Sequence, residues 1–139
     1  MRTHRRTHRR SARVEYHLPD EAQSARRARR LTAQFLARPA LRAGGLDAGH
    51  IGDAAALIVS ELVTNATRHG GGCRLCLHVS ETQVTVEVYD GSPGRPDVRP
   101  LTTWSESGRG LAMVRSLAQR LDIARVAGGG NRVLAVLDL

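Results

Sequence analysis

The sequence contains no lysine, few aromatic residues and only two cysteines, and each shortage excludes a class of function. All 21 basic residues of the 139-residue chain are arginines, so no lysine can act in catalysis or hold a phosphate. Aromatic residues make up 3% of the chain, which leaves little ring surface for stacking nucleic-acid bases. No stretch approaches the roughly 20 apolar residues of a membrane-spanning helix. We therefore expect a globular protein of the cytoplasm that has no membrane partner.

The two cysteines, Cys73 and Cys76, form a single C-x-x-C pair. A structural zinc site takes four ligands and would need a second pair, which the sequence does not contain. If residues 74–80 form a strand, positions three apart point to opposite faces, which separates the two sulfurs further. Ordinary packing is therefore the favoured interpretation of both cysteines.

The positive charge is concentrated at the N-terminus. The net charge of the chain is +8, and residues 1–13 contain six arginines and no acid, which leaves +2 for residues 14–139. We interpret residues 1–13 as a disordered basic tail and residues 14–139 as one domain. The tail could bind a polyanion in a salt-dependent way, but we rank nucleic-acid binding last because the remainder is only mildly basic.

The spacing of apolar residues predicts an α+β two-layer sandwich. In this fold, helices cover one face of a single sheet. The elements that we expect are a strand at 13–18, helices at 21–37 and 48–69, a β-hairpin of strands at 74–80 and 83–90, a helix within 107–122 and a last strand at 132–139. Residues 91–107 have no clear period, and a segment of that length is typical of a lid or a binding loop.

One predicted helix carries polar residues where an apolar face is expected. In SELVTNATRHG, residues 60–70, Glu61, Asn65 and His69 are spaced four apart. Positions i and i+4 lie on the same side of a helix, so the three side chains form one row. A buried and hydrogen-bonded Asn65 is the structural alternative. The row otherwise indicates the wall of a polar site.

Three further features suit a ligand that has a flat ring and phosphates. Asp90 ends a predicted strand and precedes Gly-Ser-Pro-Gly, where a carboxylate can accept a hydrogen bond from a ring amine. Gly108, Arg109 and Gly110 lead into a helix, whose free N–H groups suit phosphate oxygens. A glycine run at 128–130 precedes the last strand. Each feature alone is common, and the ordered set carries the interpretation.

The three segments ELVTNATRHG (61–70), YDGSPG (89–94) and GRGLAMV (108–114) resemble the N, G1 and G2 boxes of the Bergerat-fold, or GHKL, ATPases. This superfamily includes histidine-kinase catalytic domains, topoisomerase ATPase domains and small anti-sigma factor serine kinases. The resemblance covers residues 14–139 and implies a Bergerat ATP-binding fold with a mixed, mostly antiparallel sheet. The small size and the first predicted helix favour the stand-alone anti-sigma type.

The resemblance implies a role for each residue of the first two boxes. Asn65 would coordinate the Mg²⁺ that bridges the phosphates of ATP, and Glu61 would act as general base on an attacking hydroxyl. Asp90 would bind the adenine amine, and Gly94 would let the ring approach the backbone. His69 is expected to pack at the end of its helix rather than to take part in chemistry.

The third box would complete the nucleotide site. Gly108 and Gly110 would hold phosphates as the lid at 91–107 closes, and Arg109 is a candidate for a phosphate contact. Leu111, the next residue, completes the set that we assign to nucleotide binding.

The sequence departs from the family pattern at two places. Ser92 stands where a glycine is common in the G1 box. Asn131 and Arg132 follow the last glycine run, where a threonine that touches the nucleotide is frequent. The second change alters the adenine side of the expected site. Trp104 lies in the lid segment. It either packs over the nucleotide site or against a protein partner, or it is an ordinary surface residue.

Two functions therefore remain open. The first is an Mg-ATP-dependent serine/threonine kinase that binds a sigma factor and phosphorylates a STAS-type anti-anti-sigma protein. A general base such as Glu61 is superfluous in a pure binding protein, which favours this hypothesis. The second is a nucleotide-sensing module without significant transfer, which the altered segment 128–132 favours. Proteins of the anti-sigma type are often homodimers, and nothing in the sequence decides this point.

Overall fold

The computed structural model describes residues 11–47, 49–68, 71–91 and 109–139. The elements in chain order are β1 (Ala12–Leu18), α1 (Ser24–Leu36), α2 (Pro39–Ala43), α3 (His50–Thr67), β2 (Cys73–Val79), β3 (Gln83–Asp90), α4 (Arg109–Leu117), β4 (Arg120–Arg125) and β5 (Asn131–Asp138). None of the described helices combines the length and the hydropathy that a membrane-spanning helix requires.

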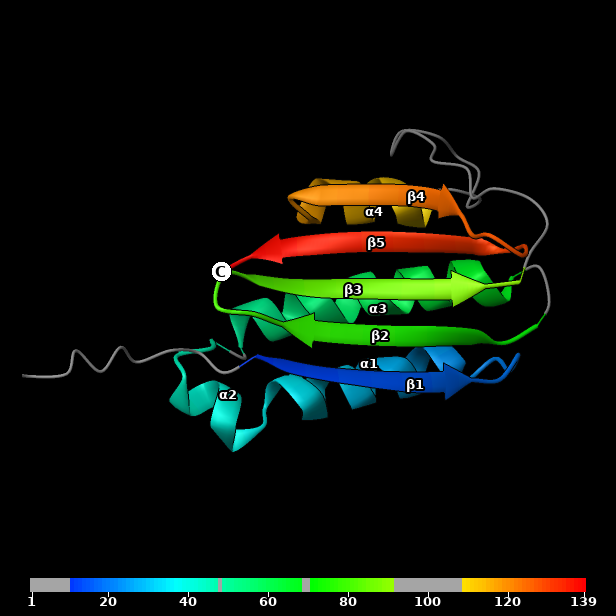
Figure 1. The fold of residues 1–139 in the computed structure, drawn as a ribbon. Helices are drawn as coiled ribbons and strands as arrows, with labels where there is room; N and C mark the ends of the chain where they lie inside the picture. The colour runs from blue at the N-terminus through cyan, green and yellow to red at the C-terminus, as the bar shows by residue number, and fades with distance from the viewer. Residues whose placement is uncertain (1–10, 48, 69–70, 92–108) are drawn as a thin grey trace, which may run out of the picture.

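The five strands form one sheet in the order β1-β2-β3-β5-β4. Each of the four neighbouring pairs is antiparallel. Figure 1 shows α1, α3 and α4 behind the sheet, all on the same face. The two-layer α+β sandwich that the sequence predicts is therefore confirmed. The resemblance implied a mixed, mostly antiparallel sheet, whereas all the pairs of the described sheet are antiparallel.

The core lies between the helices and one face of the sheet. Alternate residues of β3, Val84, Val86 and Val88, are at most 1% exposed, whereas the residues between them are only partly buried. From the other layer, Ile58 and Leu62 of α3 are also at most 1% exposed. Burial of such a side chain stabilises a fold by about 1.5–3 kcal/mol. The apolar residues that recur every two positions in the strands and about every 3.6 positions in the helices thus pack together in one core.

Two elements of the structure differ from the sequence-based expectation. The helix expected within residues 107–122 ends at Leu117, and a separate edge strand, β4, follows it. The change occurs where Gln119 N–H donates to Val136 O at 2.8 Å and so joins the chain to β5. Leu121, which fits the helical spacing, instead pairs with Ala135 in the sheet.

The second difference is α2, a five-residue helix in the segment between the two predicted helices, where the sequence predicts no element. Pro39 occupies its first turn, where the missing N–H costs nothing. Smaller shifts occur at other boundaries. β1 begins at Ala12, one residue early, and α1 begins at Ser24 because Ser24 Oγ donates to Pro19 O at 2.6 Å and holds residues 19–23 in turns.

One edge of the sheet gathers the ends of all five strands. Cross-strand pairs join Leu18 to Cys73, Cys73 to Asp90, Asp90 to Asn131 and Asn131 to Arg125. The C-terminal end of α3 and the N-terminal end of α4 lie toward the same edge (Figure 1). Residues that are distant in the sequence therefore meet at this edge on the helix-covered face.

Candidate functional site

Glu61 and Asn65 lie one turn apart on α3, at the border between the core and the solvent. Both residues are partly buried, whereas Leu62, Val63 and Ala66 of the same helix are at most 2% exposed. The helix thus places its apolar side in the core and its polar pair along one flank. The predicted row ends here, because His69 lies outside the described residues.

Gly110, in the first turn of α4, lies directly against the side chain of Glu61. A Cβ atom added at Gly110 would overlap Oε2 of Glu61 and would stand 3.3 Å from its Cδ. Only a glycine therefore allows this approach of α4 to α3 without displacing the carboxylate. The contact brings together the predicted general base and the predicted phosphate-binding turn, which are 49 positions apart.

The remaining residues of the third box are described only in part. Arg109 begins α4, but its side chain lies outside the described part of the structure, as do Gly94 and Gly108. Leu111 is 1% exposed and belongs to the core. A nucleotide contact at Leu111 would therefore use its backbone rather than its side chain.

Asp90 ends β3 on the helix-covered face and is approached by the glycine run. Gly128, Gly129 and Gly130 all have positive φ angles, of 90°, 108° and 90°, which side chains rarely tolerate. A Cβ atom at Gly130 would overlap the backbone oxygen of Asp90 and lie 3.2 Å from Cα of Gly91. The run thus forms a tight turn between β4 and β5 that packs on the end of β3.

A chain of polar contacts begins at Asp90 and crosses to the edge strand. Asn131 Nδ2 donates to Asp90 Oδ1 at 3.4 Å, and Arg125 donates from a terminal guanidinium nitrogen to Asn131 Oδ1 at 3.3 Å. Asn131 is 1% exposed, so its amide is buried between an acid and a base. The residue that replaces the expected threonine is therefore in contact with the predicted adenine-binding carboxylate.

Cys73 is the other neighbour of Asp90 in the sheet. Burial, and to a smaller degree the negative charge of Asp90, raises the pKa of the Cys73 thiol to about 11. Cys73 faces the helices and Cys76 faces the opposite side, and both are free thiols. This agrees with the expected separation of the two sulfurs. A hollow of about 380 Å³ adjoins this region, lined by His17, Leu18, Gly72, Cys73, Arg74, Tyr89, Asp90 and Gly91.

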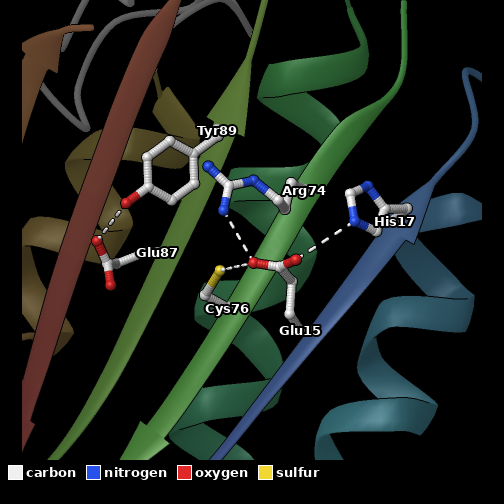
Figure 2. A network of polar contacts seen from close by, with 6 residues as sticks. All are labelled: Glu15, His17, Arg74, Cys76, Glu87 and Tyr89. Carbon is white, nitrogen blue, oxygen red and sulfur yellow. Dashed lines mark hydrogen bonds and ion pairs between the residues drawn. The ribbon is translucent and has the colours of Figure 1, made fainter.

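The opposite face of the sheet carries a polar network, and none of the described helices covers it. Figure 2 shows Glu15 accepting hydrogen bonds from Arg74 at 2.8 Å and from Cys76 at 3.4 Å. The Arg74 guanidinium lies over the ring of Tyr89, 4.0 Å from its centroid. The hydrogen bond from Arg74 lowers the pKa of Glu15 from its usual value. These residues are on the far side of the sheet from Glu61 and Asn65.

The sequence also matches a known protein family. The model of the histidine kinase-like ATPase domain matches residues 18–137, which is most of the chain. The chain belongs to this family. No curated protein matches the sequence. The match and the architecture together identify the fold as the Bergerat fold and the protein as an ATP-binding domain of the GHKL type.

The described residues of this ATPase domain fit a nucleotide. Asp90 presents a carboxylate, which can accept a hydrogen bond from a base amine. Gly110 lies in the first turn of α4, where backbone N–H groups suit phosphate oxygens. Asn65 offers an amide oxygen, a hard ligand of the kind that Mg²⁺ accepts. Within the described ranges, no three His, Cys, Asp or Glu residues come together as a metal site.

Sequence reasoning did not find that Arg125 is connected to Asp90 through Asn131. Arg125 ends β4, a strand that the sequence pattern assigned to the end of a helix and the turn after it. Asn131 was noticed only as a departure from the family pattern. The available signal was the position of an amide directly after three glycines, at the start of the last predicted strand.

Proposed function

We propose that this ATPase domain is a Mg-ATP-dependent serine/threonine protein kinase of the anti-sigma type. It would transfer the γ-phosphoryl group to a hydroxyl of a STAS-type anti-anti-sigma protein and would bind a sigma factor. The observation that carries the proposal is the position of Glu61, one turn from Asn65 and in contact with Gly110 at the start of α4. A domain that only binds ATP has no need of a carboxylate there.

Bound Mg-ATP supplies the phosphoryl group and the charge neutralisation that phosphoryl transfer needs. Asn65 would hold the metal, whose other ligands would be phosphate oxygens and water. Asp90 would accept a hydrogen bond from the adenine amine. Gly110 and the N–H groups of the first turn of α4 would bind phosphate oxygens, with Gly108, Arg109 and Leu111 beside them. Gly94 would allow the adenine ring to approach the backbone.

Glu61 would act on the protein substrate rather than on the nucleotide. Its carboxylate would accept the proton of the attacking serine or threonine hydroxyl, a step that typically contributes 10²- to 10⁴-fold. The half-buried position of Glu61 on the flank of α3 keeps the carboxylate accessible to a hydroxyl that enters from solvent. The contact with Gly110 limits the directions in which the carboxylate can point.

A nucleotide-sensing module is the alternative, and Asn131 is the observation that favours it. The asparagine replaces the threonine that the family pattern implies, and it contacts Asp90 rather than leaving that position to a hydroxyl. In such a module the bound nucleotide would set the affinity for a protein partner, and the phosphoryl group would not be transferred.

Replacement of Glu61 by glutamine separates the two functions. We expect Glu61→Gln to lower transfer from γ-labelled ATP to a STAS-type partner by about 100-fold or more, while the Kd of Mg-ATP stays within about threefold. Asp53→Asn, an exposed position in the first turn of α3, is the matched control and should retain transfer. Equal transfer by Glu61→Gln and wild type would contradict the proposed base. Partner binding that depends on ATP without any transfer would support the sensor.

A further inference from the structure

The polar chain Asp90–Asn131–Arg125 allows an inference about base selection, which rests on the proposed binding of adenine at Asp90. The three residues end β3, begin β5 and end β4, and they are in direct cross-strand register. All three lie on the helix-covered face, at the edge where the site is built. No one strand supplies two of them, so the arrangement depends on the correct pairing of all three strands.

The chemistry of the three side chains fixes the orientation of the central amide. A guanidinium only donates hydrogen bonds, and an ionised carboxylate only accepts them. An asparagine placed between them must turn its oxygen to Arg125 and its nitrogen to Asp90, as the two contacts at 3.3 Å and 3.4 Å show. The flipped amide would set oxygen against carboxylate and N–H against guanidinium. Asp90 and Arg125 together therefore fix the amide of Asn131 in a single orientation.

Burial makes this orientation persistent. Asn131 is 1% exposed, and a buried polar group that loses its partner cannot be compensated by water. The turn of three positive-φ glycines holds the start of β5 against the end of β3, since Gly130 lies against the backbone oxygen of Asp90. Asp90 is thus restrained at two points, at its backbone by Gly130 and at side-chain Oδ1 by Asn131.

We propose that Asn131 and Arg125 are positioning residues that fix the orientation in which the Asp90 carboxylate accepts a hydrogen bond from the 6-amino group of adenine. A base that carries a keto oxygen at position 6 places a second hydrogen-bond acceptor against the Asp90 carboxylate and therefore binds more weakly. Arg125, an exposed residue at the end of an edge strand, thereby contributes to nucleotide selection through Asn131 without touching the base.

The test compares the binding of Mg-ATP and Mg-ITP, because ITP replaces the 6-amino group by a keto oxygen. Calorimetric titration of both nucleotides gives the ratio of their Kd values for each variant. Asn131→Leu keeps the volume of the side chain and removes both hydrogen bonds, and it should lower the ITP:ATP ratio by about tenfold or more. Asn131→Thr retains a hydroxyl that can donate to Asp90, and it should restore most of the ratio.

Arg125→Met provides a second variant that leaves the buried amide in place. It should lower the ITP:ATP ratio by roughly threefold to tenfold, because the amide oxygen loses its donor and the amide then holds the Asp90 carboxylate less firmly. Arg120→Met is the matched control, since Arg120 lies on the same strand with its guanidinium 2.8 Å from Asp122. This control should leave the ratio within twofold of wild type.

The positioning of Asp90 by Arg125 through Asn131, which we call the relay, can be tested separately from the ATP binding on which it rests. A wild type that prefers ATP, together with Asn131→Leu and Arg125→Met variants that keep its ratio, would overturn the relay and leave the nucleotide site intact. A wild type that binds neither nucleotide would overturn ATP binding itself and the relay with it. Loss of discrimination in both variants, with recovery in Asn131→Thr, would establish the relay.

Discussion

Gly110 is the residue at which the smallest chemical change should disturb the site most. The methyl group of Gly110→Ala would overlap the Glu61 carboxylate, which lies at the flexible end of a side chain and can move away. We expect transfer to fall by about tenfold or more, because the proposed base is misplaced. The melting temperature should change by only a few degrees, because no backbone atom has to shift. Activity and thermal unfolding measure the two effects.

Gly52→Ala on α3 is the control for this substitution. Gly52 is buried in the helix, and an added Cβ would meet no atom within 4 Å. Alanine should therefore stabilise the protein by about 0.4–1 kcal/mol and leave transfer unchanged. Equal activity of Gly110→Ala and Gly52→Ala would contradict the proposed contact between Gly110 and the catalytic carboxylate.

Cys73 should make the stability of the protein fall at high pH. Its pKa is raised to about 11 in the folded protein from an ordinary value of 9.0, so the unfolded chain loses the proton first. The free energy of unfolding should therefore decrease as the pH rises from about 9 toward 11. Urea unfolding at pH 8, 9 and 10 tests this in wild type and Cys73→Ser. An identical slope in both proteins would show that Cys73 does not cause the decrease.

At the scale of elements, the turn between β4 and β5 should tolerate substitution by alanine less well at Gly130 than at Gly128. Gly128 and Gly130 have the same φ of 90°, but only a Cβ at Gly130 would overlap Asp90. Each alanine substitution should cost about 1–2 kcal/mol through backbone strain. Gly130→Ala should cost more than Gly128→Ala and should also weaken ATP binding, because the end of β3 must move.

Chemical denaturation and calorimetry of the two glycine variants give both quantities. Equal losses of stability with equal ATP affinities would mean that the turn acts only through its backbone angles. A larger loss of affinity in Gly128→Ala than in Gly130→Ala would contradict the proposed packing of the turn on Asp90.

For the whole molecule, we expect that the N-terminal basic residues can be removed without loss of nucleotide binding. β1 begins at Ala12 and pairs that residue with Val79, so a deletion of residues 1–13 would remove part of the sheet. Deletion of residues 1–10 avoids this damage and removes five arginines. We expect the Kd of Mg-ATP to stay within twofold, while retention on heparin becomes weaker and less dependent on salt. A loss of ATP binding would show that these residues contribute to the site.

The sequence predicted those parts of the molecule that depend on local spacing. Glu61 and Asn65 are four residues apart on one helix, and Asp90 ends a strand of clear alternation, so their positions follow from the helix and strand periods. Leu121 shows where this reasoning fails. It is four residues from Leu117, which suits a helix, and two from Ile123, which suits a strand. The strand is formed because residues 120–125 pair with β5.

The contacts that complete the site could not be predicted, because they join distant segments. Asn131 is 41 positions from Asp90, and Gly110 is 49 positions from Glu61. Their proximity depends on the strand order, which places β5 beside β3, and on the packing of α4 against α3. No local pattern encodes either arrangement.

The central claim is that this ATPase domain binds Mg-ATP through Asn65, and calorimetric titration of Mg-ATP tests it most directly. Wild type should bind with saturation, and Asn65→Ala should bind at least about tenfold more weakly, because the metal loses its protein ligand. Thr64→Ala, at the adjacent exposed position, should behave like wild type. No binding by wild type at millimolar ATP, or equal binding by wild type and Asn65→Ala, would contradict the claim.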